Sequence, residues 1–295
     1  MLERELSLAH AMADRAAEIA LRWFRAADLE VRAKADRSPV TEADLAIERM
    51  VREEVARAFP GDRVVGEEGG GLEGWRRGRA WIVDPIDGTK NFADGVQLWS
   101  TLIALAVEGR VVLGVVSLPG IGERYEALRG GGARLNGQPI SVSSTERLAD
   151  AFVLFSSLEG WLTGAAAEGV LGLLRGSRRS RGFGDAWSHM LVARGAADAM
   201  FERELALWDW AAIQVVVEEA GGRITQLDGR PLEHGGSAVS TNGRIHDQVL
   251  ARLAPTGERA PADRAGASGG PGQPGRSVRS PRWPAPPSSG IRSPT

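Results

Sequence analysis

The sequence predicts an α+β fold in which layers of helices and sheets alternate, and three observations indicate it. Apolar residues recur at helical spacing in several segments, and short runs rich in Val, Ile and Leu lie between them. The two kinds of segment follow one another in mixed order, whereas strict alternation would predict a doubly wound sheet. With 295 residues, 43% of them hydrophobic, the chain can bury a substantial core.

Four segments show the helical period: residues 1–25, 41–59, 185–195 and 209–220. The second is predicted to begin at Thr41, because Asp44 follows it at the spacing of a capping box. The last is followed by Gly221 and Gly222, which favour a C-cap there.

Four apolar runs bounded by glycine or charged residues are predicted to be strands: 63–66, 80–83, 101–107 and 111–117. Glu108 and Gly109 separate the last two runs in the pattern of a hairpin turn. Pro85 fixes its own φ and restricts Asp84, so a turn is expected directly after the run that ends at Val83.

The folded part of the chain is predicted to end near residue 254, where the composition changes. Nine of the 15 prolines lie in 255–295, together with six arginines and very few aliphatic residues. Such a segment cannot bury enough apolar surface to offset the entropy of ordering, so a disordered tail is expected. Residues 1–254 then form one domain, with halves of about 1–140 and 141–254.

Composition excludes several classes of function. A net charge of −2 argues against binding of nucleic acid by bulk charge, and the absence of cysteine excludes thiolate metal sites and thiol nucleophiles. The four histidines are scattered, which disfavours a zinc hydrolase with paired helical histidines. No signal peptide and no membrane span is expected, and the cytoplasm is the predicted location.

Carboxylates follow apolar runs at four places: residues 38–44, 64–68, 81–89 and 207–209. A carboxylate directly after a buried strand is held at the edge of the sheet where ligands bind in α/β proteins. Several converging carboxylates repel one another unless a cation is present, and Mg²⁺ prefers a few carboxylates together with water and phosphate.

The segment 84–89 adds a site for phosphate. Asp84 and Asp87 can face one point, and the chain then turns through Gly88 and Thr89 toward a helix N-terminus. Exposed N–H groups at such a turn bind phosphate, and the Thr89 hydroxyl can orient a water molecule.

Each acidic residue taken alone also fits a purely structural role. Asp44 and Asp209 are typical helix caps, Glu67 is typical of a solvated loop, and Lys34 is typical of an exposed surface. Turn formation does not, however, require a hydrophobic strand before each acidic patch, so their joint occurrence favours a binding site.

Together these segments resemble the signatures of the inositol monophosphatase family, over about residues 5–253. The resemblance rests on residues 66–68, 81–92, 208–212 and 219–222. Within the family, residues 34–44, 99–105, 181–188 and 234–243 are most similar to the bacterial histidinol-phosphatase branch. The resemblance implies a layered αβαβα sandwich of the sugar-phosphatase type.

The resemblance also implies roles for individual residues. It assigns two to three Mg²⁺ ions to Glu67, Asp84, the carbonyl of Ile86, Asp87 and Asp209, with Asp44 and Glu67 at a third, weaker ion. It assigns catalytic roles to Glu67, Thr89 and Asp44, and substrate contacts to Ile86, Asp87, Gly88, Thr89, Arg181, Asp185, Glu202 and Asp209. Lys34 corresponds to a lysine near a mobile metal loop.

The implied reaction is hydrolysis of L-histidinol phosphate by a water molecule that the metal activates, without a phosphoenzyme. Inositol monophosphate or another sugar or nucleotide phosphate is the alternative substrate. A third hypothesis is a non-catalytic regulator that binds RNA or protein through the same fold. A homodimer is implied, with no nucleic-acid or membrane partner.

Overall fold

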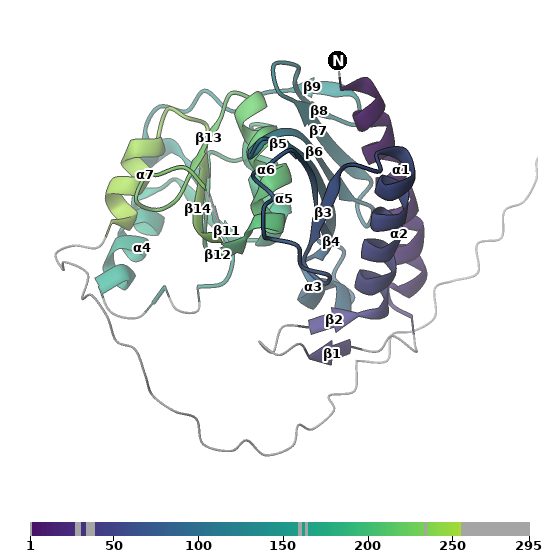
Figure 1. The fold of residues 1–295 in the computed structure, drawn as a ribbon. Coiled ribbons are helices and arrows are strands. Elements are labelled where there is room, and N and C mark those ends of the chain that lie inside the picture. Colours follow the sequence, from purple (N-terminus) through teal and green to yellow (C-terminus); the bar gives the residue numbers. More distant parts are fainter. Residues whose placement is uncertain are drawn as a thin grey trace, which may run out of the picture.

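The computed structural model describes residues 2–26, 31–33, 39–158, 161–162, 165–232 and 235–254. Their helices and sheets form five layers in the order helix, sheet, helix, sheet, helix (Figure 1). The predicted αβαβα sandwich is therefore confirmed. The predicted tail, Lys34 and His234 lie outside the described residues.

The first sheet has seven strands in the order β3-β4-β5-β6-β7-β8-β9. Only β3 and β4 are parallel, and every later pair is antiparallel. The strands are β3 (Arg63–Gly66), β4 (Arg79–Asp87), β5 (Ser100–Val107), β6 (Arg110–Leu118), β7 (Glu123–Leu128), β8 (Gly132–Leu135) and β9 (Gln138–Ile140).

The second sheet has five strands in the order β11-β10-β12-β14-β13. Strand β10 is parallel to both β11 and β12, and β14 is antiparallel to β12 and β13. The strands are β10 (Phe152–Phe155), β11 (Arg179–Gly182), β12 (Ala199–Ala206), β13 (Arg223–Thr225) and β14 (Gly235–Thr241). A separate short pair joins β1 (Val31–Ala33) to β2 (Pro39–Thr41).

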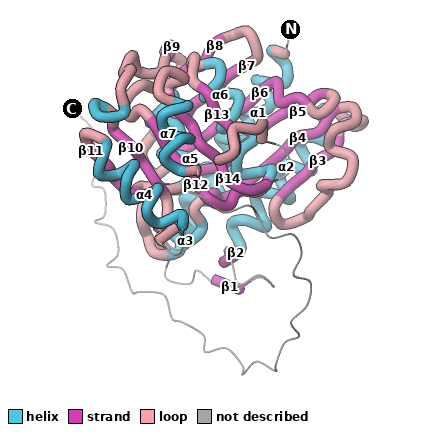
Figure 2. Tube along the Cα trace, turned by 90° about the vertical axis from the view of Figure 1, so that its left-hand side faces the viewer, coloured by secondary structure: helices cyan, strands magenta, loops and turns pink. Residues whose placement is uncertain are grey.

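Helices form the outer and central layers. Helices α1 (Glu3–Trp23) and α2 (Glu42–Ala58) cover the seven-stranded sheet, and α4 (Ala165–Gly176) and α7 (His246–Leu253) pack side by side on the five-stranded sheet (Figures 1 and 2). Helices α5 (Asp185–Ala193) and α6 (Leu207–Glu219) lie between the sheets. A short helix α3 (Thr89–Ala93) and a 3₁₀ turn (Leu148–Asp150) complete the fold.

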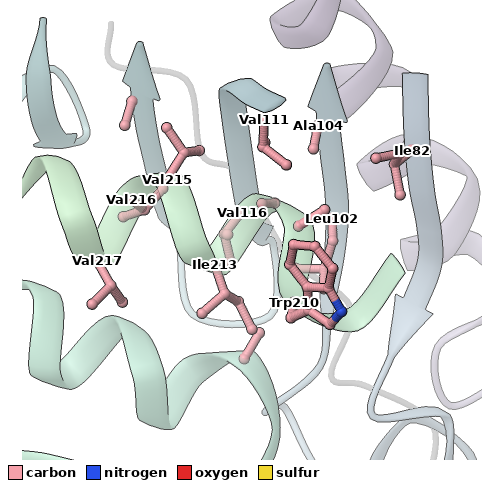
Figure 3. Packing of buried hydrophobic residues seen from close by; sticks show 14 of the residues in the cluster. Ile82, Leu102, Ala104, Val111, Val116, Trp210, Ile213, Val215, Val216 and Val217 are labelled. Carbon is pink, nitrogen blue, oxygen red and sulfur yellow. The ribbon is translucent and has the colours of Figure 1, made fainter. Parts of the chain in front are cut away.

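The central core forms where α6 packs on the seven-stranded sheet (Figure 3). Val215, Val216 and Ile213 of α6 are buried among Leu102 and other residues of the sheet. At β6 the approach is so close that a Cβ on Gly114 would lie 2.5 Å from Cγ1 of Val215. Only glycine allows this contact, because no side-chain carbon fits in that distance.

Most of the predicted elements are confirmed. All four helices and all four strands are present, and Thr41 caps α2 with Asp44 completing the capping box. The hairpin turn is present, with Glu108 and Gly109 both at positive φ, as a tight turn between two twisted strands requires. Among the described residues, no helix is long and apolar enough to cross a membrane.

One prediction about the backbone is wrong. Pro85 was expected to force a turn after Val83, but β4 continues to Asp87 with a shift of register between Asp84 and Asp87. Strand β3 pairs with β4 only as far as Val83, so on that side β4 needs no N–H at residue 85. On the other side, the Pro85 carbonyl accepts a hydrogen bond from Thr101 Oγ1 at 2.8 Å.

Candidate active site

A cavity of about 170 Å³ lies at the end of β4, between the seven-stranded sheet, α5, α6 and β12. Seven of its lining residues are acidic, and none of those the structure describes is basic. The lining comprises Glu67, Asp84, Ile86, Asp87, Gly88, Thr89, Asp185, Ala186, Glu202, Glu204, Leu205, Asp209 and Ile213. The structure thus brings together four carboxylates from distant parts of the chain, Glu67, Asp84, Asp87 and Asp209, around one cavity.

Strand β4 supplies the innermost acids. Asp84 is 2% exposed, and its Oδ1 has no hydrogen-bond partner among the described residues. Asp87 Oδ2 accepts hydrogen bonds from Ser100 Oγ at 2.9 Å and from the Ala186 N–H at 3.0 Å. The second bond joins β4 to α5, so Asp87 also ties the two sides of the cavity together.

The chain leaves β4 through the turn that was predicted to bind phosphate. Gly88 has φ 82° and precedes α3, which begins at Thr89. The Thr89 hydroxyl donates a hydrogen bond to the Ile86 carbonyl at 2.9 Å. A Cβ on Gly88 would lie 3.0 Å from Asp185 Oδ2, so the positive φ favours glycine here and any other residue would also crowd Asp185.

Glu67 lies in a tight loop that the buried Glu48 of α2 holds in place. The loop is closed by two backbone hydrogen bonds between Gly66 and Gly70. Glu48 accepts hydrogen bonds from the N–H groups of Glu68 (2.7 Å) and Gly69 (2.8 Å). Arg52 donates to the same carboxylate, so the buried charge is paired.

Asp209 and Asp44 lie in the first turns of helices, as the structural interpretation of each alone had suggested. Asp209 Oδ2 accepts a hydrogen bond from the Ala206 N–H at 2.7 Å, and Asp44 Oδ2 accepts from the Thr41 N–H at 2.8 Å. Capping does not exclude a second role, because Asp209 lines the cavity and the buried Oδ1 of Asp44 has no partner among the described residues. Asp44 is not itself part of the lining.

Asp185 and Glu202 also line the cavity, from α5 and β12 respectively. Asp185 begins α5 with φ 53°, and its Oδ2 accepts a hydrogen bond from Asn91 Nδ2 at 2.9 Å. Glu202 lies on β12, and its Oε2 is 3.0 Å from Nε2 of the buried His189.

Burial raises the pKa values of five aspartates in and beside the cavity, and the charges of neighbouring carboxylates raise them further. The pKa of Asp209 rises from 3.8 to about 8, through burial and through the charges of Asp87 and Glu67. Burial raises the pKa of Asp185 and of Asp44 to about 7, and it raises the pKa of Asp84 and Asp87 well above the ordinary value. Anions placed this close are stable together only when protons or cations neutralise them.

The arrangement favours a metal without already forming a ligand cluster. In the described part of the chain, no three or more His, Asp or Glu side chains are grouped to hold a metal ion. The chemistry of the lining is nevertheless that of hard oxygen donors, which suit Mg²⁺.

Two predicted site residues are placed differently from the rest. Arg181 lies exposed on the edge strand β11, where its Nη1 donates to the Ser180 carbonyl, and it does not line the cavity. Lys34 lies outside the described residues, so its place beside the metal loop stays a prediction.

Sequence reasoning missed three residues that shape the site: Glu48, Ser100 and Glu204. Glu48 lies on a predicted helix face between apolar neighbours, so a charged residue at an inward position was an available signal. Ser100 begins β5, one residue before the predicted strand 101–107, and it pairs with Asp87, which only the register of the sheet reveals. Glu204 lies in a charged stretch of β12 that has no apolar run to mark it.

The comparisons with known proteins agree with this site. The family model of the inositol monophosphatase family matches residues 1–258. The histidinol-phosphatase of Mycobacterium tuberculosis is 49% identical over 258 residues, which cover 86% of this chain and 99% of the relative. The histidinol-phosphatase of Streptomyces coelicolor is 45% identical over 259 residues, covering 84% and 96%.

Among solved structures, an IMPase from Thermotoga maritima aligns with a TM-score of 0.77 at 30% identity, covering 86% of this chain and 97% of that one. The predicted class of activity, hydrolysis of a phosphomonoester, is confirmed by the family and by these relatives. The resemblance seen in the motifs thus extends over the whole described fold, and the chain belongs to the inositol monophosphatase family.

Proposed function

We propose that this chain hydrolyses L-histidinol phosphate to L-histidinol and inorganic phosphate, with Mg²⁺ as its cofactor and two to three ions in each active site. One observation carries the proposal: seven acidic residues and no basic residue among those described line the cavity. A phosphate dianion is repelled from such a lining unless cations neutralise it first. The same lining attracts a cationic leaving group.

The residues present fit a divalent metal. Asp84 Oδ1 is buried without a hydrogen-bond partner among the described residues, and such an atom is costly unless a cation or proton reaches it. Burial raises the pKa of Asp209, Asp84 and Asp87, and the charges of neighbouring carboxylates raise it further.

The ligands that we propose are the residues inferred from the motifs: Glu67, Asp84, Asp87, Asp209 and the carbonyl of Ile86. Asp44 would assist Glu67 at a third, weaker ion. It lies outside the lining, but after the larger effect of burial the charges of Glu68 and Glu67 both raise its pKa. When bound, Mg²⁺ lowers the pKa of water and neutralises charge on the phosphoryl oxygens and the leaving oxygen.

The turn after β4 would hold the phosphate. The backbone N–H groups of Gly88 and Thr89 open a helix, and positive φ at Gly88 brings the chain close to the cavity. Glu67 and the Thr89 hydroxyl would position the attacking water. No phosphoenzyme forms in this scheme, because the acids of the cavity serve as ligands.

Asp185 and Glu202 would bind the leaving group. Histidinol carries an ammonium group and an imidazole, and both acids line the cavity, from α5 and β12 respectively. Their charges interact with each other, since Glu202 raises the pKa of Asp185 after the larger effect of burial. A bound cation relieves that repulsion, and this supports a cationic substrate over a neutral sugar phosphate.

A panel of phosphate esters with Mg²⁺ titration tests the proposal. We expect kcat/KM for L-histidinol phosphate to exceed that for inositol monophosphate at least about tenfold, since one charge-assisted contact contributes that much. Asp87→Asn serves as the inactive control. Equal or better turnover of inositol monophosphate would overturn the substrate assignment and leave the phosphatase assignment standing.

The remaining predictions concern organisation. We propose that residues 1–254 form the phosphatase domain, with halves of about 1–140 and 141–254, which is supported by the two sheets spanning 63–140 and 152–241. A homodimer and a cytoplasmic location remain proposals, which analytical ultracentrifugation and cell fractionation would test. Arg181, exposed on an edge strand, is kept as a proposed substrate contact of lower rank.

A further inference from the structure

His189 is fully buried on α5, and it contacts an acid of the cavity. Its Nε2 lies 3.0 Å from Glu202 Oε2, and its Nδ1 lies 2.6 Å from Ser240 Oγ. A buried histidine is most often a core residue whose polar atoms are merely satisfied. Here one of its two partners, Glu202, is a carboxylate that lines the cavity.

The hydrogen-bond chemistry fixes the direction of the chain of contacts. An ionised Glu202 can only accept, so Nε2 must donate its proton to Oε2. In a neutral imidazole, Nδ1 is then the acceptor, and the Ser240 hydroxyl donates to it. Both ring nitrogens are satisfied without a positive charge on the ring, so the negative charge of Glu202 stays available to a ligand.

The fold places these three residues on one face. Ser240 pairs with Met200 across β12 and β14, and Met200 shares its face with Glu202 two residues along the strand. Helix α5 packs on β12 and β14 (Figure 2). His189 follows Asp185 by four residues, so one side of α5 presents both of them.

Glu202 keeps one oxygen for the cavity. Among the described residues no hydrogen bond is donated to Glu202 Oε1, whereas Oε2 is fixed by His189. A carboxylate fixed by one oxygen loses rotamer freedom before the ligand arrives, so less entropy is lost on binding.

We propose that His189 is a positioning residue that orients Glu202 toward the cationic group of the substrate, and so sets the preference for a cationic ester. The inference rests on the proposed function, because only a cationic leaving group gains from a fixed carboxylate here. It goes beyond that proposal by assigning specificity to a residue that touches no substrate atom.

The test compares kcat and KM for three esters. L-histidinol phosphate and phosphoethanolamine have leaving groups that carry a positive charge, and phenyl phosphate has a leaving group without one. In His189→Leu, which has no donor, the ratio of kcat/KM between the cationic esters and phenyl phosphate should fall about tenfold, mainly through KM. His189→Gln keeps a donor near Nε2 and should restore most of the ratio.

Three further variants make the result specific. In a Glu202→Gln background, His189→Leu should change the ratio less than twofold, because the two residues act through one contact. His246→Gln is the matched control: His246 is equally buried, bonds Thr225 and Thr241, and does not line the cavity. If His189→Leu fails to fold, Ser240→Ala takes its place, and it should lower the same ratio of kcat/KM about threefold.

Equal losses for all three esters in His189→Leu, or full additivity with Glu202→Gln, would overturn the inference. If kcat/KM of the wild type is no higher for L-histidinol phosphate than for phosphoethanolamine, the substrate assignment fails. The effect of His189→Leu on the ratio of kcat/KM between the cationic esters and phenyl phosphate can still be measured. If His246→Gln shifts the ratio as strongly as His189→Leu, general destabilisation explains the effect, and the inference is wrong.

Discussion

The two sides of the cavity are built in different ways. The β4 side is one continuous stretch, residues 84–89, in which a strand, a turn and a helix start follow one another. The α5–β12 side is assembled from Asp185, Ala186, Glu202, Glu204 and Leu205, which come from two elements of the C-terminal half. The first side is local in sequence, and the second depends on the packing of the central helices.

This difference matches a division of chemistry. The β4 side holds Asp84 and Asp87, two of the four acids proposed for the metal, and the N–H groups proposed for the phosphate group that every phosphomonoester contains. The α5–β12 side holds Asp185 and Glu202, which are proposed to contact the variable leaving group. We infer that changes on the first side should abolish turnover of all esters, whereas changes on the second should redistribute it among esters.

Replacement of Asp87 by Asn is the strongest test of the first side. We expect kcat to fall about 1,000-fold or more for every ester, because a central ligand and its charge are lost. The fold should persist, since Asn can still accept from Ser100 and Ala186, and circular dichroism checks this. Near-wild-type activity at limiting Mg²⁺ would contradict the assignment.

Gly88→Ala should have the second largest effect, because it touches both sides at once. A Cβ here would lie 3.0 Å from Asp185 Oδ2 and 3.3 Å from the Leu98 carbonyl, at a φ of 82°. Displacing the phosphate turn by a fraction of an ångström should cost about 100-fold in kcat/KM for all esters. Gly122→Ala is the matched control, also at positive φ but with no atom within 4 Å, and it should change kcat/KM less than about threefold.

Asp185→Asn tests the second side. Asn tolerates the positive φ and still accepts from Asn91, so the main loss is the negative charge. KM for histidinol phosphate should rise about tenfold, and KM for phenyl phosphate should rise less. Equal changes in KM for both esters would show that Asp185 does not act selectively on the leaving group, and the proposed difference between the two sides of the cavity would be wrong.

The smallest expected effect is in the pH dependence of stability, and it sharpens the comparison by joining both sides. The pKa of Asp185 rises from 3.8 to about 7 and that of Asp209 to about 8, so the folded chain binds protons that the unfolded chain has released. These groups therefore lower metal-free stability as pH rises from about 4 to about 8.

Mg²⁺ competes with those protons, so the rise in Tm on adding Mg²⁺ should grow with pH through the same window. Differential scanning calorimetry at several pH values measures it. If the rise in Tm on adding Mg²⁺ is constant from pH 5 to pH 8, the metal does not bind at the carboxyl groups whose pKa is raised.

The local side of the cavity was the more predictable from sequence. A hydrophobic run followed by Asp84, Pro85 and Asp87 predicts a buried strand that ends in acidic residues. The capping pair Thr41 and Asp44 predicts the start of a helix. Even on this side, the path of the backbone through Pro85 could not be predicted from the sequence. The strand passes through Pro85 because β3 has already ended, and no local pattern shows where a neighbouring strand ends.

The second side could be predicted only through family resemblance. Strand β12 reads Ala-Met-Phe-Glu-Arg-Glu-Leu-Ala, with charges where an apolar run would mark a strand, because Glu202 and Glu204 face a cavity. Helix α6 was expected to begin at Asp209, but it begins at Leu207, since Asp209 caps from within the first turn. Long-range contacts, such as Asp87 with Ala186, leave no periodic signal.

The close contact at Gly114 has a consequence for catalysis far from any acid. Asp209 lies on α6 and Asp84 lies on β4, so the distance between their carboxyl groups depends on how closely α6 packs against the sheet. That depth depends on the missing side chain at Gly114, beneath Val215 and Ala212. The spacing between cations would then depend on aliphatic residues in the apolar interior, and substitutions there would change it without altering a single charge.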